Sequence, residues 1–118
     1  MANVLILENN QSLNRLYRDV LAIGGHKVID AKTCKSACEI ITQYSPNVVI
    51  LDAAFSDGQS VINSIHSTLQ LHDQTKLILI NNGNSVIPDS LADYVLQRPV
   101  ATNVLLEAVR RVTMMLPR

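Results

Sequence analysis

Asn47-Val48-Val49-Ile50-Leu51-Asp52 is the stretch that decides the fold. Four consecutive apolar residues lie behind Pro46 and Asn47 and end on a single acid. A short, unbroken apolar run of this kind is typical of a strand buried on both faces of a parallel sheet. In open α/β sheets, ligands bind outside the carboxyl ends of the strands, which is where Asp52 lies. A carboxylate there can be a nucleophile, a metal ligand or the cap of the following loop, and this stretch alone leaves all three open.

Other parts of the chain repeat this pattern of strands separated by helices. Apolar runs at 4–7 and 77–80 also end in polar residues, and the segments at 27–31, which is less hydrophobic, and 94–96 indicate two more strands. Apolar residues at helical spacing fill the segments between them. The expected inner faces of the four helices are Leu13, Leu16, Val20 and Leu21; Cys34, Ala37, Cys38 and Ile41; Val61, Ile62, Ile65 and Leu69; and Leu105, Ala108, Val109, Val112 and Met115 or Leu116.

The order of these elements predicts an α/β fold. Right-handed crossovers between parallel strands give a doubly wound five-stranded parallel sheet, order 2-1-3-4-5, with helices on both faces. The less hydrophobic run at 27–31 fits an edge of that sheet. Helix caps are expected at Asn10 or Ser12, at Thr33, and at Thr102 or Asn103, and a turn at Asp57-Gly58.

Length and composition limit the function classes. A chain of 118 residues with 47% hydrophobic residues fits one domain over 1–118. Zero net charge with interspersed signs argues against a nucleic-acid or membrane surface. No apolar run approaches the roughly 18 residues of a spanning helix, and the first residues lack a signal-peptide pattern, so we expect a cytoplasmic protein.

The two cysteines, Cys34 and Cys38, are four residues apart on a predicted helix and therefore share one face. They can be half of a metal site, a redox pair, or small apolar residues packed inside the protein. No His or Cys partner lies nearby in the sequence.

Polar side chains converge at one rim of the predicted sheet. The carboxyl ends of four strands bring together Glu8, Asn9, Asp52, Asn81 and Arg98. An aspartate that accepts a phosphoryl group needs a hard cation, oxygen ligands for that cation, and donors for the phosphoryl oxygens. This convergence, more than Asp52 alone, indicates function.

Three motifs carry a resemblance to a known family. The run from Pro46 to Asp52 is very similar to the third-strand motif of the receiver domain of two-component response regulators. Phe55-Ser56-Asp57-Gly58-Gln59-Ser60 resembles that family's Leu-Pro-Asp-Gly-x-Gly loop, and Arg98-Pro99 stands where the family has Lys-Pro. The resemblance covers essentially the whole chain, and it implies a CheY-like, flavodoxin-like fold, a cis Arg98–Pro99 bond, and a signalling module rather than an enzyme.

The resemblance also implies roles for the rim residues, several of which depart from the family pattern. Asp52 is the candidate phosphoacceptor, and Glu8, Asn9 and Asp52 form the implied Mg²⁺ site, which we expect to be weak because Asn9 replaces an acid. Asn81 replaces the hydroxyl that contacts the phosphoryl group. Arg98 keeps the charge of the family's Lys but is planar and fork-shaped, so it can pair permanently with Asp52 or Glu8.

Two departures lie on the side that family members use for output. The segment between Asn81 and Arg98 is shorter than usual and rich in helix breakers. The resemblance implies a fourth helix there, before the last one, and we expect this fourth helix to be short or missing, at most one turn near 88–92. Val95 stands where the family has its switch aromatic, and the neighbouring Tyr94 points to the other face.

Two functions therefore stay open for this chain. One is an atypical receiver in phosphorelay signal transduction that acts as a protein-interaction module with impaired phosphorylation. The other is a functional phosphoacceptor receiver, a phosphoprotein phosphorylated on Asp52 by a histidine kinase. The implied partner is a histidine kinase, a phosphotransfer protein or an output protein, without direct nucleic-acid or membrane contact, and outward apolar residues such as Val104 and Met114 leave a homodimer open. Flavin-binding, P-loop and aspartyl-phosphate hydrolase functions lack their motifs.

Overall fold

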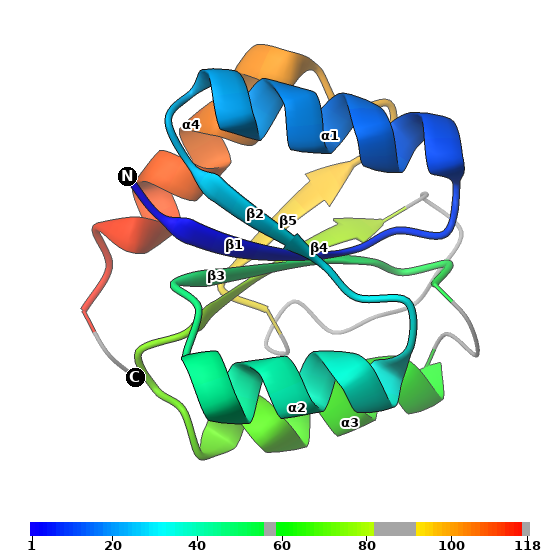
Figure 1. The fold of residues 1–118 in the computed structure, drawn as a ribbon, viewed down its shortest axis with the longest axis vertical. Coiled ribbons are helices and arrows are strands. Elements are labelled where there is room, and N and C mark those ends of the chain that lie inside the picture. The colour runs from blue at the N-terminus through cyan, green and yellow to red at the C-terminus, as the bar shows by residue number, and fades with distance from the viewer. Residues whose placement is uncertain (56–58, 82–91, 117–118) are drawn as a thin grey trace.

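The computed structural model describes residues 1–55, 59–81 and 92–116. Its strands form one parallel sheet in the order β2-β1-β3-β4-β5, which confirms the predicted topology (Figure 1). The elements are β1 (Asn3–Leu7), α1 (Gln11–Ile23), β2 (Lys27–Asp30), α2 (Cys34–Tyr44), β3 (Val48–Asp52), α3 (Gln59–Gln70), β4 (Lys76–Asn81), β5 (Tyr94–Gln97) and α4 (Thr102–Thr113).

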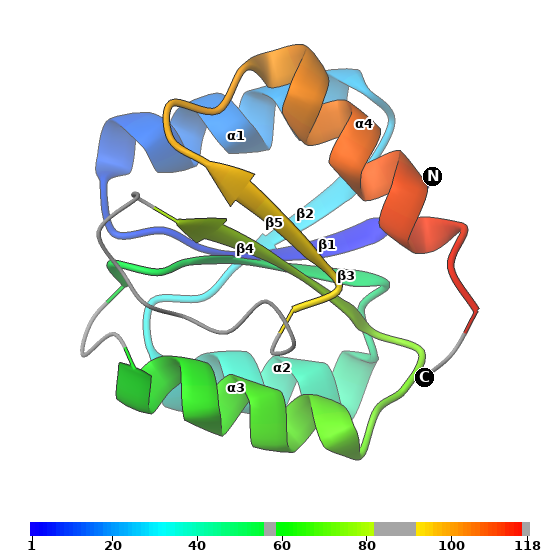
Figure 2. The ribbon, with the colours of Figure 1, turned by 180° about the vertical axis from the view of Figure 1, so that it is seen from behind.

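Helices cover both faces of the sheet. Helices α1 and α4 lie on one face, and α2 and α3 lie on the other (Figures 1 and 2). Every residue of β3 and β4 is buried, because each strand presents alternate side chains to a helical layer on either side. Thus Val49 and Leu51 join the core under α2 and α3, whereas Val48 and Ile50 join the core under α1 and α4.

The strand register places the carboxyl ends of the strands at one edge. Leu7 of β1 pairs with Leu51 of β3, and Asp52 of β3 pairs with Ile80 of β4. Because all pairings are parallel, the carboxyl ends of β1, β3, β4 and β5 lie at the same edge of the sheet. This is the geometry that the candidate site requires.

Two of the predicted helix caps are confirmed. The Asn10 side chain accepts a hydrogen bond from the Leu13 amide at 3.0 Å and begins α1. The Thr33 hydroxyl accepts from the Ser36 amide at 3.0 Å and begins α2. Each side chain satisfies an amide that has no partner within its own helix.

The cap predicted for the last helix is wrong. The N-cap of α4 is Ala101, which makes no side-chain cap, and Thr102 and Asn103 already lie within the helix. The turn is closed by the backbone alone, since the Leu105 amide donates to the Ala101 carbonyl at 3.0 Å. A residue inside the helix no longer has the extended backbone that a capping side chain needs.

The inner face of α1 differs from the prediction. Asn14, Tyr17 and Leu21 are its buried residues, whereas Leu16 is 43% exposed and Val20 is half-buried. Asn14 turns inward because it finds hydrogen-bond partners there, and this rotates Leu16 to the rim of the helix. The inner faces of α2, α3 and α4 agree with the prediction, except that Cys34 and Cys38 are half-buried and Met115 and Leu116, beyond the end of α4, are exposed.

The fourth helix of the described chain is present over Thr102–Thr113. The expectation of a short or missing fourth helix is therefore wrong as a description of the helices seen here. The place where that helix was expected, near 88–92, falls almost wholly within 82–91, outside the described residues, as does the turn predicted at Asp57-Gly58. None of the described helices combines the length and apolar character needed to cross a membrane.

Candidate functional site

One guanidinium group joins two buried carboxylates at the carboxyl edge of the sheet. The Nη2 atom of Arg98 lies 2.6 Å from Glu8 Oε1 and also contacts Asp52 Oδ2. The side chains of Glu8 and Asp52 are 4% and 2% exposed, and that of Arg98 is 29% exposed. The ends of β1, β3 and β5 are therefore tied together by one charge-assisted cluster.

Backbone contacts hold the members of this cluster in place. The Arg98 amide donates to the Asn81 carbonyl at 2.9 Å, which extends the β4–β5 pairing by one residue. The Asp52 carboxylate accepts from the Ala54 amide at 2.7 Å through Oδ1, which leaves Oδ2 to Arg98. The Arg98–Pro99 peptide bond is cis, as the family resemblance implies.

Burial dominates the electrostatics of Glu8. Loss of solvent raises the pKa of Glu8 above its usual 4.5, although the charge and hydrogen bond of Arg98 act to lower it. The backbone amides of Asn9 and Asn10 also act to lower it. The pKa of Glu8 is nevertheless raised, so Arg98 compensates only part of the cost of placing this carboxylate inside the protein.

The structure brings together three of the five predicted rim side chains. Glu8, Asp52 and Arg98 meet directly, and Asn81 lies buried beside them at the end of β4. The side chain of Asn9 is exposed and makes no hydrogen bond or ion pair with another described residue. Asn9 and Asn81 stay predicted site residues.

The observed side chains do not fit a magnesium ion as long as the Arg98 guanidinium contacts both Glu8 and Asp52. Mg²⁺ takes oxygen ligands in near-ideal octahedral geometry and favours carboxylates. Here the two nearby carboxylates already share a cation, and the described ranges hold no group of three or more His, Cys, Asp or Glu residues suited to a metal. The weak Mg²⁺ site at Glu8, Asn9 and Asp52 stays a prediction.

Asn14 is a site-supporting residue that sequence reasoning missed. It is 4% exposed, and its amide nitrogen donates to the Glu8 carbonyl at 3.1 Å and to Asp30 Oδ1 at 2.9 Å. Asp30 also pairs with Lys32 at 2.7 Å. Asn14 therefore fixes the chain where it leaves β1, next to the Glu8 carboxylate. The available signal was a polar residue three before Tyr17 on the same helical stripe.

The aromatic residue on β5 packs against a helical layer. Tyr94 is half-buried and contacts the core beneath α1 and α4. The preceding residue, Asp93, accepts a hydrogen bond from the Leu77 amide at 2.7 Å, which anchors the start of β5 to β4. Val95, where the resemblance predicts a switch aromatic in other members, is also half-buried.

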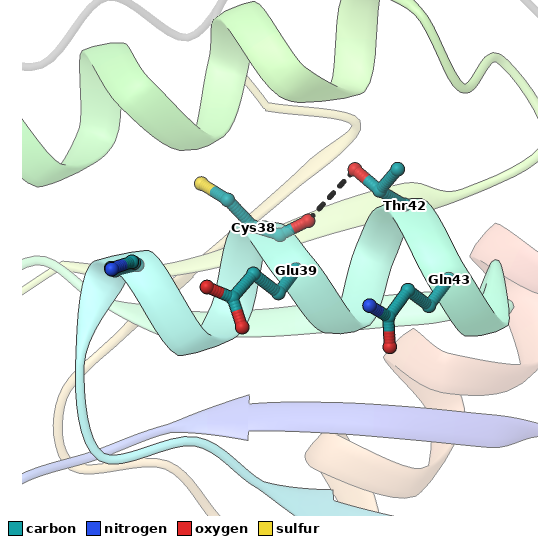
Figure 3. Close-up of a pocket in the computed structure, with 5 residues that line it drawn as sticks. Cys38, Glu39, Thr42 and Gln43 are labelled. Carbon is teal, nitrogen blue, oxygen red and sulfur yellow. Dashed lines mark hydrogen bonds between the residues drawn. The ribbon is translucent and has the colours of Figure 1, made fainter.

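The cysteine pair lies on α2, away from this cluster. In Figure 3 the Cys38 side chain points toward α3, whereas Glu39 and Gln43 point away from it. The Thr68 hydroxyl donates to Cys38 Sγ at 3.3 Å, and burial raises the pKa of the Cys34 thiol, with Cys38 adding to the effect. Both cysteines are free and pack against the core under α2 and α3, and no third metal ligand joins them among the described residues.

Comparison with known proteins identifies the fold. The chain is similar to the response regulator receiver domain protein of Clostridium thermocellum, with 18% identity, a TM-score of 0.83, and coverage of 96% of this chain and 94% of that one. It is also similar to the CheY-like receiver domain protein of Methanospirillum hungatei JF-1, with 19% identity, a TM-score of 0.82, and coverage of 94% and 92%. These similarities show that the chain has the fold of receiver domains.

A sequence relative adds a partial match. Over 61 residues the chain is 33% identical to the KDP operon transcriptional regulatory protein KdpE of Escherichia coli K12. The match covers 52% of this chain and 27% of that protein, so the matched stretch spans about a quarter of the relative's length. No family model matches the sequence.

Proposed function

We propose that residues 1–118 form one receiver domain of a cytoplasmic two-component system, and that it acts as a protein-interaction module with impaired phosphorylation. Its partners are proteins: a histidine kinase, a phosphotransfer protein or an output protein. Support for a signalling module rather than an enzyme comes from the receiver fold. Support for impaired phosphorylation comes from a single observation, the pairing of Arg98 with both Glu8 and Asp52.

The pairing opposes phosphorylation in two ways. Both oxygens of Asp52 are engaged, Oδ1 with the Ala54 amide and Oδ2 with Arg98, so an attacking oxygen must first leave one of them. The guanidinium also balances the charge of Asp52 before any modification. Asp52 therefore already holds a cation that competes with the hard cation that phosphoryl transfer to an aspartate needs.

Weak Mg²⁺ binding follows from the same contacts. An ion that approaches Glu8 and Asp52 has to displace a cation already held by two buried carboxylates. Two opposite unit charges about 4 Å apart attract each other by about 4 kcal/mol at an effective dielectric constant of about 20. The neutral Asn9 supplies no such attraction, so it does little to favour the ion over the guanidinium.

A functional phosphoacceptor is the second candidate. It is favoured by the position of Asp52 at the carboxyl end of the central strand β3, beside a second acid, Glu8. Its carboxylate oxygen would attack the phosphorus of a donor and form a new P–O bond, and the donor's leaving group would take the electrons of the bond that breaks, P–N for a phosphohistidine and P–O for acetyl phosphate. The partial similarity to KdpE, named as a transcriptional regulatory protein, agrees with either candidate.

Intact mass separates the two candidates. The protein is incubated with acetyl phosphate and Mg²⁺, and Asp52→Asn serves as the matched control. We expect no phosphoryl adduct on either protein, and no change in amide NMR spectra with beryllofluoride. A stable adduct on the wild-type chain that is absent from Asp52→Asn would reject the impaired-phosphorylation proposal in favour of the phosphoacceptor.

A restored site provides a second test. We predict that Asn9→Asp, Asn81→Thr and Arg98→Lys together raise Mg²⁺ affinity by about tenfold or more, since they add a carboxylate and replace the bridging guanidinium. Isothermal titration measures the affinity, and Arg110→Lys on the exposed side of α4 is the control. Unchanged affinity in the triple variant would place the defect in the backbone rather than in these side chains.

A further inference from the structure

Two thiol groups lie one helical turn apart on α2, at its contact with α3. Cys34 and Cys38 are both free and half-buried, and both pack against the core under α2 and α3. In Figure 3 the Cys38 side chain points toward α3. Cys38 also lines a hollow of about 300 Å³ on α2, together with Lys35, Glu39, Thr42 and Gln43. The pair is therefore partly sheltered by the protein and still reachable from solvent.

The two sulfur atoms are neighbours, and each has a hydroxyl group from α3 beside it. Burial raises the pKa of the Cys34 thiol, the charge of Cys38 and hydrogen bonding to Cys38 add to this, and hydrogen bonding to Ser64 opposes it. The Thr68 hydroxyl oxygen lies 3.3 Å from Cys38 Sγ and 3.0 Å from the Ser64 carbonyl oxygen, so its one proton serves either acceptor. Ser64 and Thr68 are four residues apart on α3, as the cysteines are on α2, so the two pairs match across the contact between the helices.

The helical spacing of the cysteines suits a bridging ion better than a disulfide bond. Side chains four residues apart on a helix have Cβ atoms about 5–6 Å apart. A disulfide needs Cβ atoms about 3.5–4.5 Å apart, so a direct S–S bond would distort α2. An ion bonded to both sulfurs at about 2.3 Å spans up to about 4.6 Å between them, which covers the longer separation without that distortion.

The number of available ligands selects the kind of ion. Zn²⁺ in a structural site takes four ligands. The described residues offer no group of three or more His, Cys, Asp or Glu suited to a metal, and in Figure 3 the Glu39 side chain points away from α3. Thiolates favour soft ions, and Cu⁺ is one of these. Unlike Zn²⁺, Cu⁺ is stable with two sulfur ligands arranged in a line.

We propose that Cys34 and Cys38 form a two-coordinate site for a soft monovalent cation, Cu⁺. Each thiol gives up its proton as its sulfur binds, so one Cu⁺ enters, two protons leave and no electron is transferred. The bound thiolates carry negative charge, and the hydroxyl groups of Ser64 and Thr68 lie where they can donate hydrogen bonds to them. The proposal stands whichever function holds for Asp52, because the two sites share no residue.

Anaerobic titration of the full chain with Cu⁺, in competition with the chelator bicinchoninate, tests the proposal. We expect the chain to withdraw one equivalent of Cu⁺ from the chelator, and copper X-ray absorption to report two sulfur neighbours. Because Cu⁺ is diamagnetic, amide NMR locates the ion, and shifts should centre on residues 34–38 and 64–68. Failure to withdraw Cu⁺, or three or more sulfur neighbours per ion, would overturn the proposal.

Single substitutions provide the controls. Cys34→Ser and Cys38→Ser each leave one sulfur, so each variant should lose Cu⁺ to the chelator, and urea unfolding without copper checks that the variants fold. Thr68→Val keeps the side-chain shape and removes the hydroxyl, which should weaken Cu⁺ binding by about tenfold. Ser67→Ala, at an exposed position on α3, should leave the affinity unchanged.

Three results would contradict a two-coordinate Cu⁺ site. The first is full Cu⁺ affinity in either folded serine variant, which would place the ion elsewhere. The second is displacement of Cu⁺ by an equal concentration of Zn²⁺, which would require further ligands. The third is ready formation of a disulfide within the monomer on treatment with the thiol oxidant diamide, which would refute the spacing argument that selects a bridging ion.

Discussion

Removal of the guanidinium from the Arg98 cluster should destabilise the fold strongly at neutral pH. Arg98→Gln keeps much of the side-chain length but leaves the buried Glu8 and Asp52 carboxylates without a cation. The loss of one partner from a buried ion pair costs about 3–5 kcal/mol. Because the Arg98 side chain is 29% exposed, solvent screens part of this, and we expect a loss of about 2–3 kcal/mol. For a chain of this length that corresponds to a fall in Tm of about 10 °C.

The pH dependence of this loss gives a sharper signature. Arg98 acts to lower the pKa of Glu8, so its removal raises that pKa further above 4.5. The native variant then binds a proton that the unfolded chain does not, between the unfolded and the raised pKa. The difference in unfolding free energy between the wild-type chain and Arg98→Gln should therefore shrink as the pH falls from 7 toward 4.5.

Urea unfolding of both proteins at several pH values measures the effect. The matched control is Arg110→Gln, because Arg110 is exposed and pairs with Glu107 within α4. That pair is on the surface, where solvent and salt screen it, so its loss should change stability little. If Arg98→Gln is as stable as the control at pH 7, or if its deficit grows in acid, the cluster does not carry the charge balance inferred here.

Three further predictions concern single residues outside the cluster. Burial and the amino-terminal charge lower the pKa of His26 from 6.5, and its Nδ1 accepts a hydrogen bond from the Ala2 amide. The folding stability should therefore fall as the pH drops below 6.5. Urea unfolding of a His26→Gln variant should lack this pH dependence. Thr33→Ala removes the α2 cap and should cost about 1 kcal/mol in the same assay; no loss would contradict the cap. Ser45 ends α2 with a φ of 46°, so Ser45→Gly should stabilise by about 0.5–1 kcal/mol, visible as a higher Tm.

The strands were predictable because their sequence pattern has a single physical cause. A strand buried on both faces needs an apolar residue at every position, and 48–51 and 77–80 meet that need without interruption. The order of the strands followed from the handedness of the crossovers, which leaves few arrangements. The convergence of Glu8, Asp52 and Arg98 followed in turn from parallel pairing alone.

The inner face of α1 was not predictable from apolar spacing. Leu13, Leu16 and Val20 follow a helical stripe, yet Asn14 and Tyr17 are the residues that turn inward. Asn14 is buried because Asp30 and the Glu8 carbonyl receive its amide, and those partners come from other elements. Apolar periodicity measures hydrophobicity only, so it misses a polar residue whose burial depends on tertiary hydrogen bonds.

The side-chain placement at the rim was only partly predictable. The sequence placed Asn9 in a metal site beside Glu8, but successive residues at a strand end point in different directions, and Asn9 is exposed. The planar fork of Arg98 favours an ion pair with Asp52 or Glu8, and the structure has a contact to each. Its sharing between two acids through one nitrogen depends on the exact register of β5, which no local pattern defines.

The all-parallel sheet has a consequence for how the chain reaches its native state. Within the described sheet every strand pairs with a strand distant in sequence, and the shortest separation, from Ile78 to Tyr94, is 16 residues. Val4 of β1 pairs with Val48 of β3, which lies 44 residues later in the sequence. Strand β1 can therefore pair with β3 only after those 44 residues have been synthesised. Since loops must close before such pairings stabilise anything, refolding should be slow for a protein of this size, and a nascent chain on the ribosome should stay open until β3 emerges.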